Sequence, residues 1–100
     1  MIIVRETFVA KPGQAGKMAK LFRKAFPKDN NMRVMTDYIG NYNTVVMEMQ
    51  LENLAEFEKQ MEDYKSGKPD PNMDPQVAEE MSKYTEMYLT GRREVYQIIE

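Results

Sequence analysis

The order in which strand-like and helix-like patterns follow one another constrains the fold of this chain most. Residues 2–10 (IIVRETFVA) are rich in β-branched and aromatic side chains, which is typical of a strand. Lys11-Pro12-Gly13 then interrupts the run, and from Gln14 onward the apolar residues recur at helical spacing. Pro27 should end this helix, because its ring cannot continue the ladder of backbone hydrogen bonds.

Five more segments with regular patterns follow. Residues 32–39 and 44–51 are strand-like runs separated by a Gly/Asn turn, which predicts a β-hairpin. Helical spacing returns over residues 53–65 and again over residues 75–89, with a polar, proline-rich loop between them. The final run, at residues 92–99 (RREVYQII), is typical of a strand.

Local signals mark where the last helix should begin and end. Asp74 precedes Pro75, and an aspartate N-cap before a proline at the first helical position favours a helix start. Gly91 is a suitable helix stop. The order β-α-β-β-α-(α)-β therefore indicates an α+β, ferredoxin-like fold of the split β-α-β type. It has a four-stranded antiparallel sheet, helices on one face and one extra helix before the last strand.

A sheet with helices on only one face leaves its other face uncovered. Val46 and other apolar side chains of the strands should lie on that face. A second copy of the chain would cover it, so we expect a homodimer.

Composition limits the chemistry available to the chain. It has no cysteine and no histidine, which excludes thiolate catalysis, cysteine-based zinc sites and imidazole bases or ligands. We therefore expect no metal and no cofactor. With 100 residues, 42% of them hydrophobic, the chain suits a single domain over residues 1–100. Since no apolar run approaches the roughly 20 residues that cross a bilayer and no secretory signal is apparent, we expect a cytoplasmic protein with no membrane partner.

Charge is distributed unevenly along the chain. Residues 1–28 contain seven basic residues and one acidic residue, although the net charge of the chain is −2. A basic face could bind an anionic partner, but charge runs on helices usually mark the solvated face, and we favour that interpretation. The aromatic signature of RNA-recognition domains is absent from both central strands, so we expect no nucleic-acid partner.

Arginine and glutamate should face each other on the uncovered side of the sheet. If the first and third strands are antiparallel neighbours, a register that pairs residues 5 and 48 places Arg5 opposite Glu48. Glu6 would then point awkwardly toward the helices. The candidates for ligand binding are Arg5, Thr7, Glu48, Gln50 and Gln97, and the candidates for catalysis are Glu48, Arg5 and Tyr38.

Two interpretations of this pair remain open. In the functional one, Arg5 anchors an anionic or carbonyl ligand, and Glu48 is a general base whose pKa is raised by an enclosed site. Tyr38 or Thr7 would then supply a hydrogen bond. In the structural one, which we favour, Arg5 and Glu48 form only a cross-strand ion pair at a dimer interface.

Four segments of the chain carry a resemblance to a known group of proteins. They are Lys11-Pro12-Gly13, the hairpin over residues 37–48, Leu54-Ala55-Glu56-Phe57-Glu58 and Gly91-Arg92-Arg93-Glu94-Val95-Tyr96. Together they resemble the dimeric α/β-barrel (ferredoxin-like) superfamily, and its NIPSNAP-like and other small uncharacterised members in particular. The resemblance implies a homodimer whose two sheets face each other around a cavity. Its haem-using members generally bind iron through a histidine, which this chain lacks.

The superfamily includes cofactor-free monooxygenases, lactone isomerases and proteins without known activity, so two functions remain as hypotheses. The first is an uncharacterised dimeric protein that is non-catalytic or binds a small molecule. The alternative is a cofactor-independent monooxygenase or isomerase that acts on an enolisable small molecule in the barrel cavity. An open, polar cavity that reaches Glu48 would favour the enzyme.

Overall fold

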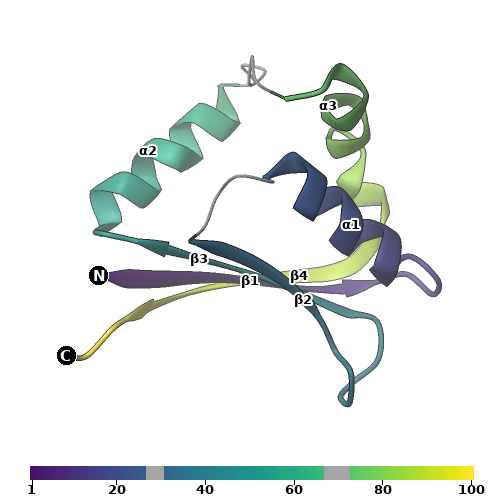
Figure 1. The fold of residues 1–100 in the computed structure, drawn as a ribbon, viewed down its shortest axis with the longest axis horizontal. Coiled ribbons are helices and arrows are strands. Elements are labelled where there is room, and N and C mark those ends of the chain that lie inside the picture. Colours follow the sequence, from purple (N-terminus) through teal and green to yellow (C-terminus); the bar gives the residue numbers. More distant parts are fainter. Residues whose placement is uncertain (27–30, 67–72) are drawn as a thin grey trace.

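The computed structural model describes residues 1–26, 31–66 and 73–100, with only the backbone described at Tyr64. Its elements are β1 (Ile2–Ala10), α1 (Ala15–Ala25), β2 (Met32–Thr36), β3 (Thr44–Leu51), α2 (Leu54–Lys65), α3 (Pro75–Met81), the short 3₁₀ helix η1 (Tyr84–Glu86) and β4 (Tyr88–Gln97). The strands form one antiparallel sheet in the order β2-β3-β1-β4. The helices lie over the same face of that sheet (Figure 1), which confirms the predicted fold class. Pro27 lies outside the described residues.

The strand register assigns each side chain to one of two faces. Arg5 lies opposite Glu48 of β3, as predicted, and opposite Glu94 of β4. Directly opposed residues point to the same side of a sheet. The face under the helices, here the helix face, carries Ile2, Val4, Glu6, Phe8, Ala10, Met32, Val45, Met47, Met49, Leu51, Arg93, Val95 and Gln97. The other face, here the open face, carries Ile3, Arg5, Thr7, Val9, Arg33, Met35, Thr44, Val46, Glu48, Gln50, Arg92, Glu94 and Tyr96.

The second strand is shorter than predicted, because β2 ends at Thr36 rather than at Ile39. Asp37 is the cause. Its carboxylate accepts hydrogen bonds from the backbone N–H groups of Tyr42 (2.8 Å) and Thr44 (2.9 Å), which closes the hairpin loop early.

The helix predicted over residues 75–89 begins as expected but ends early. The Asp74 carboxylate caps α3 by accepting a hydrogen bond from the backbone N–H of Gln76 at 2.8 Å. The α-helix ends at Met81, however, and β4 starts at Tyr88, four residues before the predicted strand.

Aromatic packing explains this difference. Tyr84 and Tyr88 have helical spacing, yet both rings pack against Phe8, with ring centroids 6.2 and 4.9 Å away. Gly91 does not end a helix but lies in β4 opposite Phe8. A Cβ there would come within 3.3 Å of the Phe8 ring, so glycine permits the close approach.

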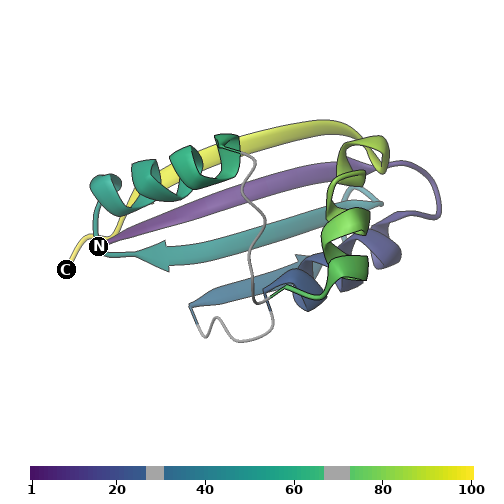
Figure 2. The same ribbon diagram turned by 90° about the horizontal axis from the view of Figure 1, so that it is seen from above.

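The core on the helix face is divided into two clusters. The larger one lies under α1, α3 and η1, and its buried residues are Phe8, Ala10, Met18, Phe22, Met32, Val45 and Met47. The smaller one consists of Ile2, Val4 and Leu51, with Phe57 of α2 packed against it. In Figure 2, α2 and the α1–α3 pair cover different ends of the sheet.

Candidate functional site

Two carboxylate–arginine pairs lie on opposite sides of β1. Neighbouring residues of a strand point to opposite faces, so Arg5 emerges on the open face and Glu6 on the helix face. Arg5 forms an ion pair with Glu48 of β3, and Glu6 forms one with Arg93 of β4. The two pairs differ in their number of partners and in what surrounds them.

On the open face, Glu48 is held by two arginines. Arg5 donates from Nε to Glu48 Oε2 at 2.6 Å, and Arg33 of β2 donates to Oε1 from Nε at 3.0 Å and from Nη2 at 2.8 Å. Only 7% of the Glu48 side chain is exposed. Each carboxylate oxygen therefore has a charged donor, and these contacts offset the cost of burying the charge.

These contacts lower the pKa of Glu48. The hydrogen bond from Arg33 is the largest cause, and the contact with Arg5 adds to it, whereas burial acts in the opposite direction. The hydrogen bond to Glu48 in turn raises the pKa of Arg5. A carboxylate with a lowered pKa and no unpaired oxygen is a weak proton acceptor, so this geometry favours the structural interpretation of the pair.

The open face collects most of the predicted site residues, and the hollow that a single chain forms there is small. Arg5, Thr7, Glu48 and Gln50 share it, as expected. The hollow beside Glu48 measures about 200 Å³, below the roughly 300–1,000 Å³ typical of ligand pockets. The amide of Gln50 contacts the sulfur of Met1.

Two predicted site residues lie elsewhere. Tyr38 is fully exposed in the loop after β2, because that strand ends before it. Gln97 is paired with Ile2 and therefore lies on the helix face, opposite to Glu48. Neither residue joins the Arg5–Glu48 pair.

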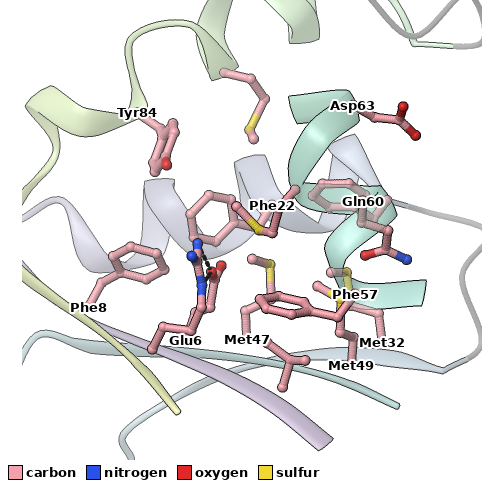
Figure 3. A pocket seen from close by; sticks show the side chains of 15 residues that line it. Glu6, Phe8, Phe22, Met32, Met47, Met49, Phe57, Gln60, Asp63 and Tyr84 are labelled. Atoms are coloured by element: carbon pink, nitrogen blue, oxygen red, sulfur yellow. Dashed lines mark hydrogen bonds and ion pairs between the residues drawn. The ribbon is translucent and has the colours of Figure 1, made fainter. Parts of the chain in front are cut away.

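A larger pocket, of about 390 Å³, lies on the helix face between the sheet and the helices (Figure 3). Its apolar walls come from β1, β2, β3, α1, α2, α3 and η1, and consist of Val4, Phe8, Phe22, Phe26, Met32, Met47, Met49, Phe57, Met61, Met81 and Tyr84. Glu6, Gln60, Asp63 and Arg93 are its polar lining residues. The pocket is in contact with both core clusters, and its volume and lining are those of a small-molecule site.

Glu6 and Arg93 form the charged part of this pocket. Arg93 approaches Glu6 Oε1 with Nε at 2.6 Å and with Nη2 at 2.5 Å. Both contacts use the same oxygen, and none of the described residues donates to Oε2. The Arg93 guanidinium also lies 5.8 Å from the centroid of the Phe57 ring, which connects β4 to α2.

The sequence contained a signal for this pair, although the candidates did not include it. Every second residue of β1 from Ile2 to Ala10 is apolar except Glu6. Arg93 lies on the corresponding face of β4, beside Gly91, Val95 and Gln97. A charge on the otherwise apolar face of β1 indicates that a polar partner lies opposite it, and the antiparallel pairing of β1 with β4 was needed to identify that partner as Arg93.

The part of the chain that the structure describes has neither a metal-binding cluster nor a membrane-crossing helix. It contains no group of three or more Asp, Glu, His or Cys side chains that could hold a metal ion. None of its helices is both long and apolar enough to cross a membrane.

Comparison with known proteins supports the fold. No protein-family model matches the chain, and no curated protein matches it. It is similar to the structure of an uncharacterised NIPSNAP domain protein from Burkholderia xenovorans (TM-score 0.70, 14% identity, 99% of this chain and 95% of that one). A NIPSNAP family protein from Agrobacterium tumefaciens gives a TM-score of 0.74 at 11% identity, with 99% and 86% covered.

A further similar structure is that of a candidate antibiotic biosynthesis monooxygenase from Chloroflexus aurantiacus (TM-score 0.67, 8% identity, 99% and 93% covered). Both groups of structures have the dimeric α/β-barrel fold. The chain shares the fold of their single chains, which confirms the fold class that its resemblance implied.

Proposed function

We propose that the protein binds a small apolar molecule in the helix-face pocket. The observation that carries this proposal is a pocket of about 390 Å³ with phenylalanine and methionine walls and a charged pair in its lining. Methionine side chains adapt their shape to different ligands, which suits such a wall. The pocket is also larger than the hollow beside Glu48, where both carboxylate oxygens already have partners.

A neutral fluorescent probe tests the proposal. N-phenyl-1-naphthylamine should gain fluorescence with the wild-type protein, and Met61→Trp, which fills the pocket from α2, should weaken its binding about tenfold or more. Leu54→Trp is the matched control, because Leu54 lies on the same helix, is 61% exposed and does not line the pocket. Absence of binding, or equal weakening by both variants, would contradict the proposal.

The protein also acts as a homodimer in this proposal, with the open faces of two copies packed together. Val9, Met35 and Tyr96 are exposed there, and Ile3 and Val46 are half-buried. Their burial would contribute roughly 25 cal/mol per Å². Sedimentation at micromolar concentration should give a species of twice 11.7 kDa, and a species of 11.7 kDa alone would refute the dimer.

A second candidate function is catalysis on an enolisable substrate, and the observation that favours it is Glu6 Oε2, to which no residue of the described segments donates. A carboxylate in an apolar pocket can accept the proton that leaves the carbon beside a carbonyl group, which gives an enolate and a carboxylic acid. The acid exchanges its proton with solvent and returns a solvent proton to the same carbon, which restores the ketone and the carboxylate. The protein should then accelerate deuterium exchange at the α-carbons of 2-tetralone in D₂O, and Glu6→Gln should abolish the acceleration. Exchange at the buffer rate would exclude this function.

A further inference from the structure

The Glu6 carboxylate has an unused acceptor inside the apolar pocket. Its two contacts with Arg93 both end on Oε1, and no donor for Oε2 exists among the described residues. The Glu6 side chain is only 15% exposed. In Figure 3 it rises from β1 toward the helices, among the aromatic and methionine walls.

An acceptor without a partner in such a place favours a ligand that supplies a donor. An ionised carboxylate only accepts hydrogen bonds, and a hydroxyl or N–H group is its complement. Hydrogen bonds to a charged acceptor are stronger than those between neutral groups. A ligand without a donor would displace water from Oε2 without replacing the hydrogen bond that the water donates, and this would weaken its binding.

Charge in the pocket disfavours an acidic ligand. Its charged lining residues are Glu6, Asp63 and Arg93, which together carry one net negative charge. The Arg93 guanidinium is already engaged with Glu6 and lies against the Phe57 ring. A ligand carboxylate would have to compete with Glu6 for Arg93 and would meet two negative side chains.

The volume of the pocket limits the size of the apolar part of the ligand. An apolar cavity of about 150 Å³ is enough for benzene. A pocket of about 390 Å³ therefore has room for two or three fused rings.

We infer that the ligand is a molecule of about two or three rings that carries a hydroxyl or N–H donor, which binds Glu6 Oε2, and that it carries no acid group. This inference rests on the proposed function, since it concerns the same pocket. Glu6 then selects between ligands of similar shape by the hydrogen bond that each can donate.

Three probes of one size distinguish the possibilities: 1-naphthol donates a hydrogen bond, 1-methoxynaphthalene only accepts, and 1-naphthoate is an anion. Their dissociation constants for the wild-type protein can be measured by ligand-observed NMR. Naphthol should bind about tenfold or more tightly than each of the others, which is the range expected for a hydrogen bond to a charged group.

Glu6→Gln tests whether Glu6 is the source of this preference. The amide keeps the shape of the side chain but removes its charge, so the ratio of methoxynaphthalene to naphthol dissociation constants should fall toward one. Glu94→Gln is the matched control, because it makes the same change on the open face and should leave the ratio unchanged.

Each outcome has a distinct meaning. A wild-type preference for naphthol that is lost in Glu6→Gln and kept in Glu94→Gln supports the inference. Equal binding of naphthol and methoxynaphthalene overturns it and leaves the proposed function standing, as does a preference for naphthoate or a preference that Glu6→Gln leaves intact. Failure of all three probes to bind overturns the proposed function itself.

Discussion

Each face of the sheet carries a glutamate paired with arginine, but the two glutamates differ in how completely they are paired. On the open face, the Glu48 carboxylate receives hydrogen bonds on both oxygens from two arginines. On the helix face, among residues 1–26, 31–66 and 73–100, the Glu6 carboxylate is paired through one oxygen only, beside a pocket of about 390 Å³. A buried carboxylate with charged donors on both oxygens stabilises the pairing of its strands, whereas we propose that the half-paired carboxylate in the apolar pocket binds a ligand.

The largest expected effect is on the open face. Removing both arginines with Arg5→Ala and Arg33→Ala leaves Glu48 almost buried without a charged donor, which should lower the free energy of unfolding by roughly 3 kcal/mol. Each single change should cost about 1 kcal/mol, because the other arginine still pairs with Glu48 and both arginines are partly exposed. Urea unfolding of the four proteins at one fixed concentration measures this. A double variant no less stable than the single variants would show that the two arginines do not stabilise the buried Glu48 carboxylate.

The pH dependence of the free energy of unfolding tests the pairing of Glu48 independently. Because Arg33 and Arg5 lower the pKa of Glu48 in the folded chain, the contribution of Glu48 is present above its unfolded value of 4.5. It is lost as the pH falls through the lower, folded pKa. Urea unfolding between pH 6 and pH 3 should show a steeper loss of stability in the wild type than in Glu48→Gln. Parallel profiles would show that Glu48 has the same pKa in both states.

A smaller effect concerns α3, which contributes Met81 to the pocket wall. Asp74→Ala removes the N-cap of this helix and should cost about 1 kcal/mol. It should also weaken probe binding on the helix face while leaving the Arg5–Glu48 pair unaffected. Thermal unfolding and probe titration check both effects, and a variant with wild-type values in each would show that the cap does not support the pocket.

The smallest change in stability is expected for the pair in the pocket. Replacing Glu6 and Arg93 together by leucine should alter the free energy of unfolding by less than about 1 kcal/mol, because the Arg93 side chain is 45% exposed and a partly exposed ion pair contributes little to stability. The pocket should keep about its volume but lose the carboxylate, so titration of this variant should show no preference for 1-naphthol over 1-methoxynaphthalene. A large loss of stability would mean that Glu6–Arg93 is as structural as the Glu48 cluster.

The sequence predicted the framework of the molecule well because strand and helix periodicities depend on local patterns. The antiparallel pairing of the first and third strands, the opposition of residues 5 and 48 and the Asp74 cap are all confirmed. The end of α3 was mispredicted, since the helical spacing of Tyr84 and Tyr88 arises from packing on Phe8, a contact distant in sequence.

The candidate site was harder to predict for a related reason. Predicting the contact between Arg5 and Glu48 required only the pairing of β1 with β3. Predicting that Arg33 also contacts Glu48 would have required the register of β2 against β3 as well. The Glu6–Arg93 pair depends on the pairing of β1 with β4, and the space beside it depends on the placement of α2 relative to α1. No local pattern encodes the space between two helices.

The most direct test of the account is a titration with 1-naphthol followed through the methyl signals of the methionines, of which the chain has ten. Five line the pocket, namely Met32, Met47, Met49, Met61 and Met81, whereas Met35 lies on the open face. With ¹³C-methyl-labelled methionine, saturable shifts should be largest for the five pocket signals and negligible for Met35. Shifts centred on Met35, or no saturable shift at any methionine, would contradict the assignment of the ligand site to the helix face.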